Sequence, residues 1–168
     1  YTSQIYSIAL GGGMSSRLFQ EIREKRGLCY TIFAQGGAYS DTGLLTIYSG
    51  TSADSLKDLS DITISEMKRM AIDFEQIELD RARVQMKAGL LMGLESASAR
   101  AERLARMLTI WDRIPTLDEI VKKIDAVDLN DVRHFSDSII SNKKPTLSTY
   151  GPISNGVPFN QIIDSLVA

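Results

Sequence analysis

The chain has 168 residues, of which 43% are hydrophobic and 24% charged, and its formal net charge is −2. This length and composition indicate one soluble globular domain, and the charge argues against a nucleic-acid-binding protein. A single cysteine excludes an internal disulfide, and no apolar run approaches the roughly 20 residues of a membrane helix, so we expect no membrane span.

The first 26 residues predict two helices joined by a glycine-rich loop. Apolar residues three and four apart indicate a helix over residues 1–10. We expect Gly11 to end it in the left-handed conformation, and a hydroxyl of Ser15 or Ser16 to cap a second helix that stops at Gly27. Because the first residue already lies in a helical pattern, we expect the chain to be cut from a larger protein.

The period of the sequence changes after the second helix. Alternating β-branched and aromatic residues from Leu28 to Phe33 predict a strand, and Gly36-Gly37 indicates a bulge or bend within it. A turn at residues 40–43 leads to a second strand over residues 44–51. The two strands are predicted to form an antiparallel hairpin.

The remainder is predicted to be mostly helical. Amphipathic patterns and caps indicate helices over residues 55–71, from an Asp73/Gln76 capping box to residue 93, over residues 96–111, after Thr116, and after Asp128. A short last strand is predicted at residues 145–150 and an amphipathic segment at residues 159–166. Few strands and many helices that segregate in sequence indicate an α+β layer fold. So small a sheet is thin, and a strand upstream of Tyr1 would complete it.

Residues for metal or nucleophilic catalysis are scarce. His134 is the only histidine, so a two-histidine zinc helix is impossible, and its polar helix face favours a solvated residue. Cys29 has neither a CxxC partner nor a nearby base, which favours inert packing, and Ser15-Ser16 lacks a nucleophile-elbow context. The loop at residues 11–13 offers free N–H groups to a phosphate, but it matches no phosphate-binding motif, which favours a tight turn.

Arg23 and Tyr30 lie on opposite sides of a short turn and can present a cation and a phenol to one substrate. From the residues alone, a simpler interpretation is favoured. Arg17, Arg23, Lys25 and Arg26 form a solvated helix face whose cations suit the helix C-terminus, and Tyr30 is a strand aromatic with its hydroxyl at the surface.

A resemblance changes this balance. Residues 11–34, GGGMSSRLFQEIREKRGLCYTIFA, closely resemble the zinc-free second half of pitrilysin-type (inverzincin) zinc metallopeptidases, which include the mitochondrial processing peptidase and short bacterial zinc proteases. The likeness continues through AYSDTGLLTIYSGTS, ESASARAERLARM and IDAVDLNDVRHF to TYGP. It implies an antiparallel-rich sheet with helices packed on one face, and two such halves that clamp around a chamber.

The resemblance also implies a site. One half of such an enzyme carries zinc on an H-x-x-E-H motif, and the other supplies an arginine and a tyrosine, which match Arg23 in EIREKRG and Tyr30 in GLCY. These are the expected catalytic residues. Arg23 would orient a peptide carbonyl or carboxylate, Tyr30 would donate to the scissile carbonyl or its oxyanion, and the sheet edge would bind peptide by strand addition. No cofactor is expected in this chain, and zinc is expected in the missing or partner half.

Residues 1–168 are therefore expected to be one domain, a truncated C-terminal half of a zinc metalloendopeptidase that is inactive alone. The expected partners are a peptide substrate and a zinc-bearing half, in a dimer or a two-domain clamp. The alternative is a non-catalytic peptidase-like scaffold or partner subunit, and a third is an unrelated α+β ligand-binding domain. The compartment stays open among bacterial cytoplasm, bacterial envelope and organelle matrix.

Overall fold

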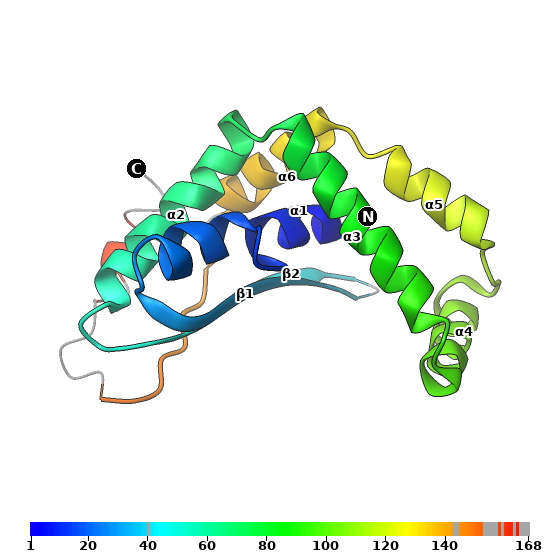
Figure 1. Cartoon of the computed structure of the whole chain (residues 1–168), viewed down its shortest axis with the longest axis horizontal. Helices are drawn as coiled ribbons and strands as arrows, with labels where there is room; N and C mark the ends of the chain where they lie inside the picture. The colour runs from blue at the N-terminus through cyan, green and yellow to red at the C-terminus, as the bar shows by residue number, and fades with distance from the viewer. Residues whose placement is uncertain (40, 143–144, 153–157, 159, 163, 165–168) are drawn as a thin grey trace.

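The computed structural model describes residues 1–39, 41–142, 145–152, 158, 160–162 and 164. Helices lie along one side of a single β-hairpin, with α1 nearest to the strands (Figure 1). This arrangement confirms the predicted α+β fold with helices on one face of the sheet. The elements are α1 (Thr2–Gly11), η1 (Phe19–Glu24), β1 (Cys29–Ala38), β2 (Gly43–Thr51), α2 (Leu56–Ile72), α3 (Gln76–Gly93), α4 (Ala97–Trp111), α5 (Leu117–Asp125) and α6 (Leu129–Asn142).

The hairpin has one buried and one open face. β1 and β2 pair antiparallel, from Ala38 opposite Gly43 to Cys29 opposite Thr51. Ile32 and Ala34 point inward and are buried in the same core cluster as the apolar residues of α1. On the opposite face, Phe33, Gln35, Leu44 and Tyr48 are exposed, so the middle of the outer face is open to solvent in the part of the chain that the structure describes.

The end of α1 differs from the prediction. Gly11 is the last residue of the helix, and Gly12 follows with φ −89°, so no left-handed glycine closes α1. The glycine is needed for packing instead: a Cβ on Gly11 would lie 2.5 Å from the backbone nitrogen of Ala34. Gly11 therefore allows the end of α1 to touch β1.

Replacing Gly11 by alanine is expected to lower the free energy of unfolding by about 1–3 kcal/mol, because the helix must move off the strand. Gly89→Ala in α3 is the matched control, since a Cβ there meets nothing within 4 Å. The control should stabilise by up to about 1 kcal/mol through helix propensity. Urea denaturation measures both, and equal effects of the two substitutions would contradict the packing role.

Local signals predicted most helix starts correctly. The predicted caps Thr116 and Asp128 each accept a hydrogen bond from the backbone N–H three residues later, at 3.2 and 2.8 Å. Ser96, the predicted start of α4, does the same at 3.3 Å. The predicted Asp73/Gln76 capping box is wrong. Glu75 and Glu78 form the box at the start of α3, because the Asp73 carboxylate is held by an arginine from a distant segment.

Two other local predictions are wrong. Ser16 does not cap the second helix, since its Oγ donates to the Gly13 carbonyl, and the helix passes after two residues into the π-helix η1. Residues 145–150 form no strand and are mostly exposed. A strand needs a neighbour, and none in the described part of the chain lies beside this segment. The predicted segment at residues 159–166 falls largely outside the described residues.

Candidate functional site

Tyr30 stands at an irregularity in the hairpin. Cys29 lies opposite Thr51 but Thr31 lies opposite Gly50, so Tyr30 is an extra residue in β1. In a regular strand Tyr30 would share a face with buried Ile32, yet its side chain is 87% exposed while that of Cys29 is 9% exposed. The bulge thus reverses the alternation and turns the phenol outward, as bulges do beside functional sites.

The predicted bulge at Gly36-Gly37 is correspondingly wrong. Gly36 pairs with Leu45 and Gly37 with Leu44 in regular register. The bulge was predicted at these glycines because glycine tolerates irregular backbone conformations. The actual bulge carries no glycine, and nothing local in the sequence indicated it.

Arg23 leaves η1 as an unneutralised cation. Its guanidinium carbon lies 4.6 Å from the centroid of the Phe19 ring, a cation–π contact that orients the charge without cancelling it. The neighbouring cations Lys25 and Arg26 both pair with Glu21. Arg23 has no carboxylate partner among the described residues. Its donors therefore remain available to an oxygen of a ligand.

The turn between Arg23 and Tyr30 is tightly built. The Gly27 N–H donates to the Arg23 carbonyl and the Leu28 N–H to the Ile22 carbonyl, both at 3.0 Å. Gly27 has φ +62°, the left-handed conformation that ends the helix as predicted. No hydrogen bond or ring contact joins Arg23 directly to Tyr30 within the described chain. Their convergence on one substrate stays a prediction, although neither side chain is sealed in the core.

Arg17 was expected on a solvated face, and that prediction is wrong. Its side chain is 10% exposed and pairs with two carboxylates. Nε and Nη2 donate to the two carboxylate oxygens of Glu78, each at 2.6 Å, and Nη1 donates to Asp73 at 2.6 Å. Glu66 lies farther away, at 3.9 Å. Arg17 thereby ties the segment that carries Arg23 to the corner between α2 and α3.

The two carboxylates that Arg17 binds, Glu78 and Asp73, have lowered pKa values. Burial acts to raise the pKa of Glu78, but the hydrogen bonds from Arg17 and from the Glu75 N–H outweigh it and hold the pKa below 4.5. Burial also acts to raise the pKa of Asp73. The hydrogen bonds from Arg17 and Arg69 outweigh this effect and hold the pKa of Asp73 below 3.8. Both carboxylates are therefore more acidic in the folded chain than in the unfolded one.

We expect acid to weaken the fold through these two groups. Well above pH 4.5 both carboxylates are ionised in either state, and their stabilisation is fully present. As pH falls further, the unfolded chain binds protons first, so the free energy of unfolding decreases until the folded pKa values are passed. Urea denaturation from pH 6 to pH 2.5 measures this decrease. The decrease should be smaller in Arg17→Met, and an identical pH profile for that variant would contradict the assignment.

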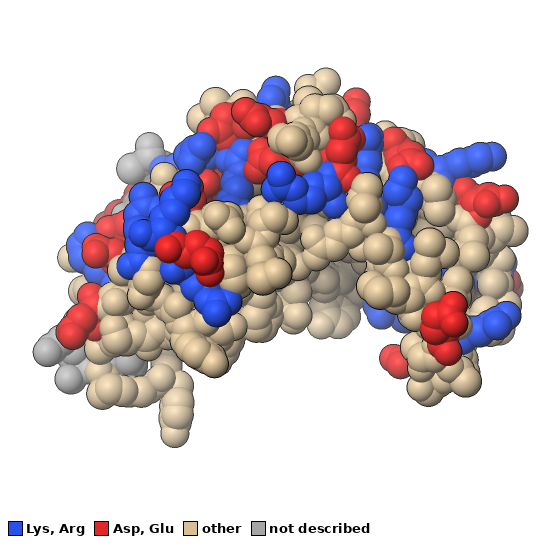
Figure 2. Space-filling view, viewed as in Figure 1, with Lys and Arg blue, Asp and Glu red and all other residues tan. Residues whose placement is uncertain are grey.

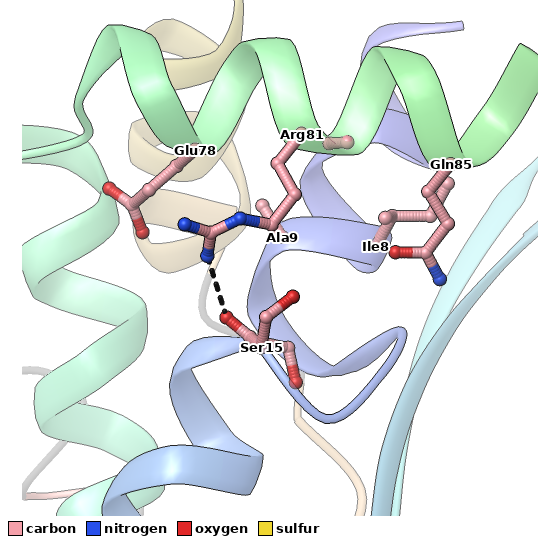
Figure 3. A pocket seen from close by; sticks show the side chains of 8 residues that line it. Ile8, Ala9, Ser15, Glu78, Arg81 and Gln85 are labelled. Carbon is pink, nitrogen blue, oxygen red and sulfur yellow. Dashed lines mark hydrogen bonds between the residues drawn. The ribbon is translucent and has the colours of Figure 1, made fainter.

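Side chains of α3 bind the backbone of the glycine loop and of the residues that follow it. Arg81 reaches from α3 and donates to the Ser15 carbonyl at 3.2 Å (Figure 3), and Gln85 donates to the Gly12 carbonyl at 2.7 Å. The hollow between the loop and α3 measures about 10 Å³, room for no more than about one water. These contacts support the predicted tight turn, and the hollow itself is too small for a phosphate.

The donor set of the described residues does not fit a zinc ion. Among them, no three or more histidine, cysteine, aspartate or glutamate side chains are grouped so that they could hold a metal ion. Cys29 is buried in the core, and His134 is exposed on α6. No helix among the described residues is long and apolar enough to cross a membrane.

A family model described as "Peptidase M16 inactive domain" matches residues 1–86, which hold Arg23, Tyr30 and the whole hairpin. The chain belongs to the M16 peptidase family, as its inactive domain. This confirms the resemblance seen in the sequence.

Relatives described as zinc proteases or as a processing peptidase extend the match along the chain. An "Uncharacterized zinc protease YmxG" of Bacillus subtilis is 38% identical over 79% of this chain and 32% of the relative. The mitochondrial-processing peptidase subunit beta of Mus musculus is 30% identical over 94% of this chain and 32% of the relative. The chain thus spans about a third of the length of the curated relatives it matches.

Solved structures show the same fold. A chain of "Complex III2 from Candida albicans, Inz-5 bound" superposes with a TM-score of 0.86 at 20% identity, covering 99% of this chain and 42% of that one. A protease from Helicobacter pylori gives a TM-score of 0.66 at 24% identity, covering 82% and 33%. The M16 inactive domain therefore explains the fold, while the roles of Arg23 and Tyr30 depend on the site itself.

Proposed function

We propose that this M16 domain is the substrate-orienting, zinc-free part of a zinc metalloendopeptidase, and that residues 1–168 belong to the C-terminal half of that enzyme. The bulge that turns the Tyr30 phenol outward carries the proposal. A regular strand would bury this residue, so the irregularity supports a role outside the core. An exposed phenol and an unneutralised arginine at the two ends of one short turn suit a ligand rich in oxygen acceptors, such as a peptide backbone.

Tyr30 would stabilise the reacting carbonyl oxygen, and Arg23 would orient the peptide. The Tyr30 hydroxyl has no hydrogen-bond partner among the described residues, so its proton is free for the scissile carbonyl oxygen, whose negative charge grows during hydrolysis. Arg23 would hold a neighbouring carbonyl or carboxylate with two donors and fix the register of the peptide. The metal, which the described donor set does not fit, would be held by the other half.

Reconstitution tests this proposal. This domain and its zinc-bearing half are mixed, and cleavage of a fluorogenic peptide library is followed with each half alone, with the mixture, and with a chelator. We expect cleavage by the mixture alone, its loss with chelator and its return with added zinc. Cleavage by the isolated domain, or an intact complex that binds peptide without cutting it, would overturn the proposal.

The second outcome would favour the alternative of a peptidase-like scaffold. The likeness to a chain of Complex III2 does not decide between the two roles, because at 20% identity it shows the fold alone. The sequence of the zinc-bearing half, with or without an H-x-x-E-H helix, separates the two roles independently.

A further inference from the structure

The two strands of the hairpin that carries Tyr30 contain no charged residue; the turn between them holds Asp41. Neither β1 nor β2 has an aspartate, glutamate, lysine or arginine, although such residues make up 24% of the chain. Acidic and basic side chains gather mainly over the helices (Figure 2). The outer face of the two strands is therefore an uncharged surface, and the turn before Tyr30 joins it to η1, which carries the unneutralised Arg23.

An aromatic pair stands at the centre of this face. Phe33 and Tyr48 are cross-strand partners, and their rings stack with centroids 5.2 Å apart and planes at 24°. They remain 39% and 52% exposed, and Leu44, on the same face of β2, is 60% exposed. A stacked pair that stays open to solvent offers a rigid apolar platform, because little side-chain freedom is lost when a ligand covers it.

We propose that Phe33, Tyr48 and Leu44 form a subsite for one aromatic or large aliphatic side chain of the peptide substrate. Phe33 follows Tyr30 by three residues, which places the platform about 10 Å along the strand from the phenol. An extended peptide covers that distance in about three residues. This inference rests on the proposed function and adds the substrate class to it: peptides with an apolar residue about three positions from the cleaved bond.

Charge complementarity selects this occupant. A basic or acidic peptide side chain on the platform would lose its hydration and find no partner on either strand. A basic side chain would also meet the positive charge of Arg23, whereas peptide carbonyl oxygens meet it favourably. An uncharged peptide segment with an apolar side chain matches both parts of the surface. A second copy of the chain, or the zinc-bearing half itself, are the other occupants that the test must detect.

The test uses the complete enzyme and two peptides that differ only in phenylalanine or serine three positions from the cleaved bond. Wild-type enzyme should prefer the phenylalanine peptide in kcat/KM by roughly ten- to a hundredfold. Phe33→Ser and Tyr48→Ser should remove most of this preference by lowering kcat/KM for that peptide alone. Tyr39→Ser, at an exposed tyrosine outside the paired strands, is the matched control and should leave the preference intact.

Each other result has a defined meaning. No preference in the wild type, or equal losses for both peptides, overturns the subsite. Weaker association of the two halves or of two copies in Phe33→Ser, seen by analytical ultracentrifugation, also overturns it and identifies a protein interface. The proposed function fails separately, when Arg23 and Tyr30 variants retain full activity on both peptides.

Discussion

Replacing Tyr30 by phenylalanine is expected to lower kcat of the complete enzyme by roughly ten- to a thousandfold, the range for losing one donor to a developing oxyanion. KM should change little, because this hydrogen bond strengthens only as the carbonyl oxygen gains charge. The fold should be untouched, since the side chain is 87% exposed. Steady-state kinetics on one peptide, with circular dichroism of the variant, measures both.

Arg23→Ala is expected to lower kcat by a factor in the same range. It should also raise KM more than Tyr30→Phe does, because the arginine holds the peptide in the ground state as well. Arg23→Lys should recover only part of the loss, since an ammonium keeps the charge but not the planar pair of donors. Tyr39→Phe is the matched control for Tyr30→Phe and should leave both constants unchanged. Near-wild-type kinetics in Tyr30→Phe and Arg23→Ala together would refute the assigned roles.

Arg17→Ala is expected to be strongly destabilising, with a loss of about 3–5 kcal/mol in the free energy of unfolding. The substitution leaves Glu78 and Asp73 without the donors that they share, close to a third carboxylate on Glu66. Domains of this size are typically stable by only about 5–15 kcal/mol. Urea denaturation at pH 7 measures the loss.

Two controls separate the buried cluster from ordinary surface charge. Lys25→Ala removes a cation from the same segment, but its pair with Glu21 is exposed, so we expect a change within about 1 kcal/mol. The double variant Arg17→Met/Glu78→Gln should be more stable than Arg17→Met alone, because it no longer buries an unpaired charge, while glutamine can still accept from the Glu75 N–H. A loss below about 1 kcal/mol for Arg17→Ala would show that the cluster is not a structural tie.

The sequence was sufficient where structure is determined by neighbours in the chain. The caps at Ser96, Thr116 and Asp128 lie next to the N–H groups they bind, and Gly27 adopts the left-handed conformation that its position after a helix predicts. The family resemblance added the layer arrangement and the candidate pair.

The sequence was insufficient where distant segments decide. Arg17 shares a helical stretch with exposed cations, but its partners Asp73 and Glu78 are 56 and 61 residues away, so no local pattern distinguishes it. The bulge at Tyr30 depends on how β1 pairs with β2, which the alternation of residue types cannot show. Residues 145–150 have the composition of a strand, but strand formation requires a neighbour.

A structure of the complete enzyme with a bound peptide, in a catalytically inactive zinc-bearing half, tests the central claim most directly. We expect the Tyr30 hydroxyl about 2.7–3.1 Å from the scissile carbonyl oxygen, with the Arg23 guanidinium on an adjacent carbonyl or carboxylate. A peptide held at the zinc with both side chains out of hydrogen-bonding reach would contradict it.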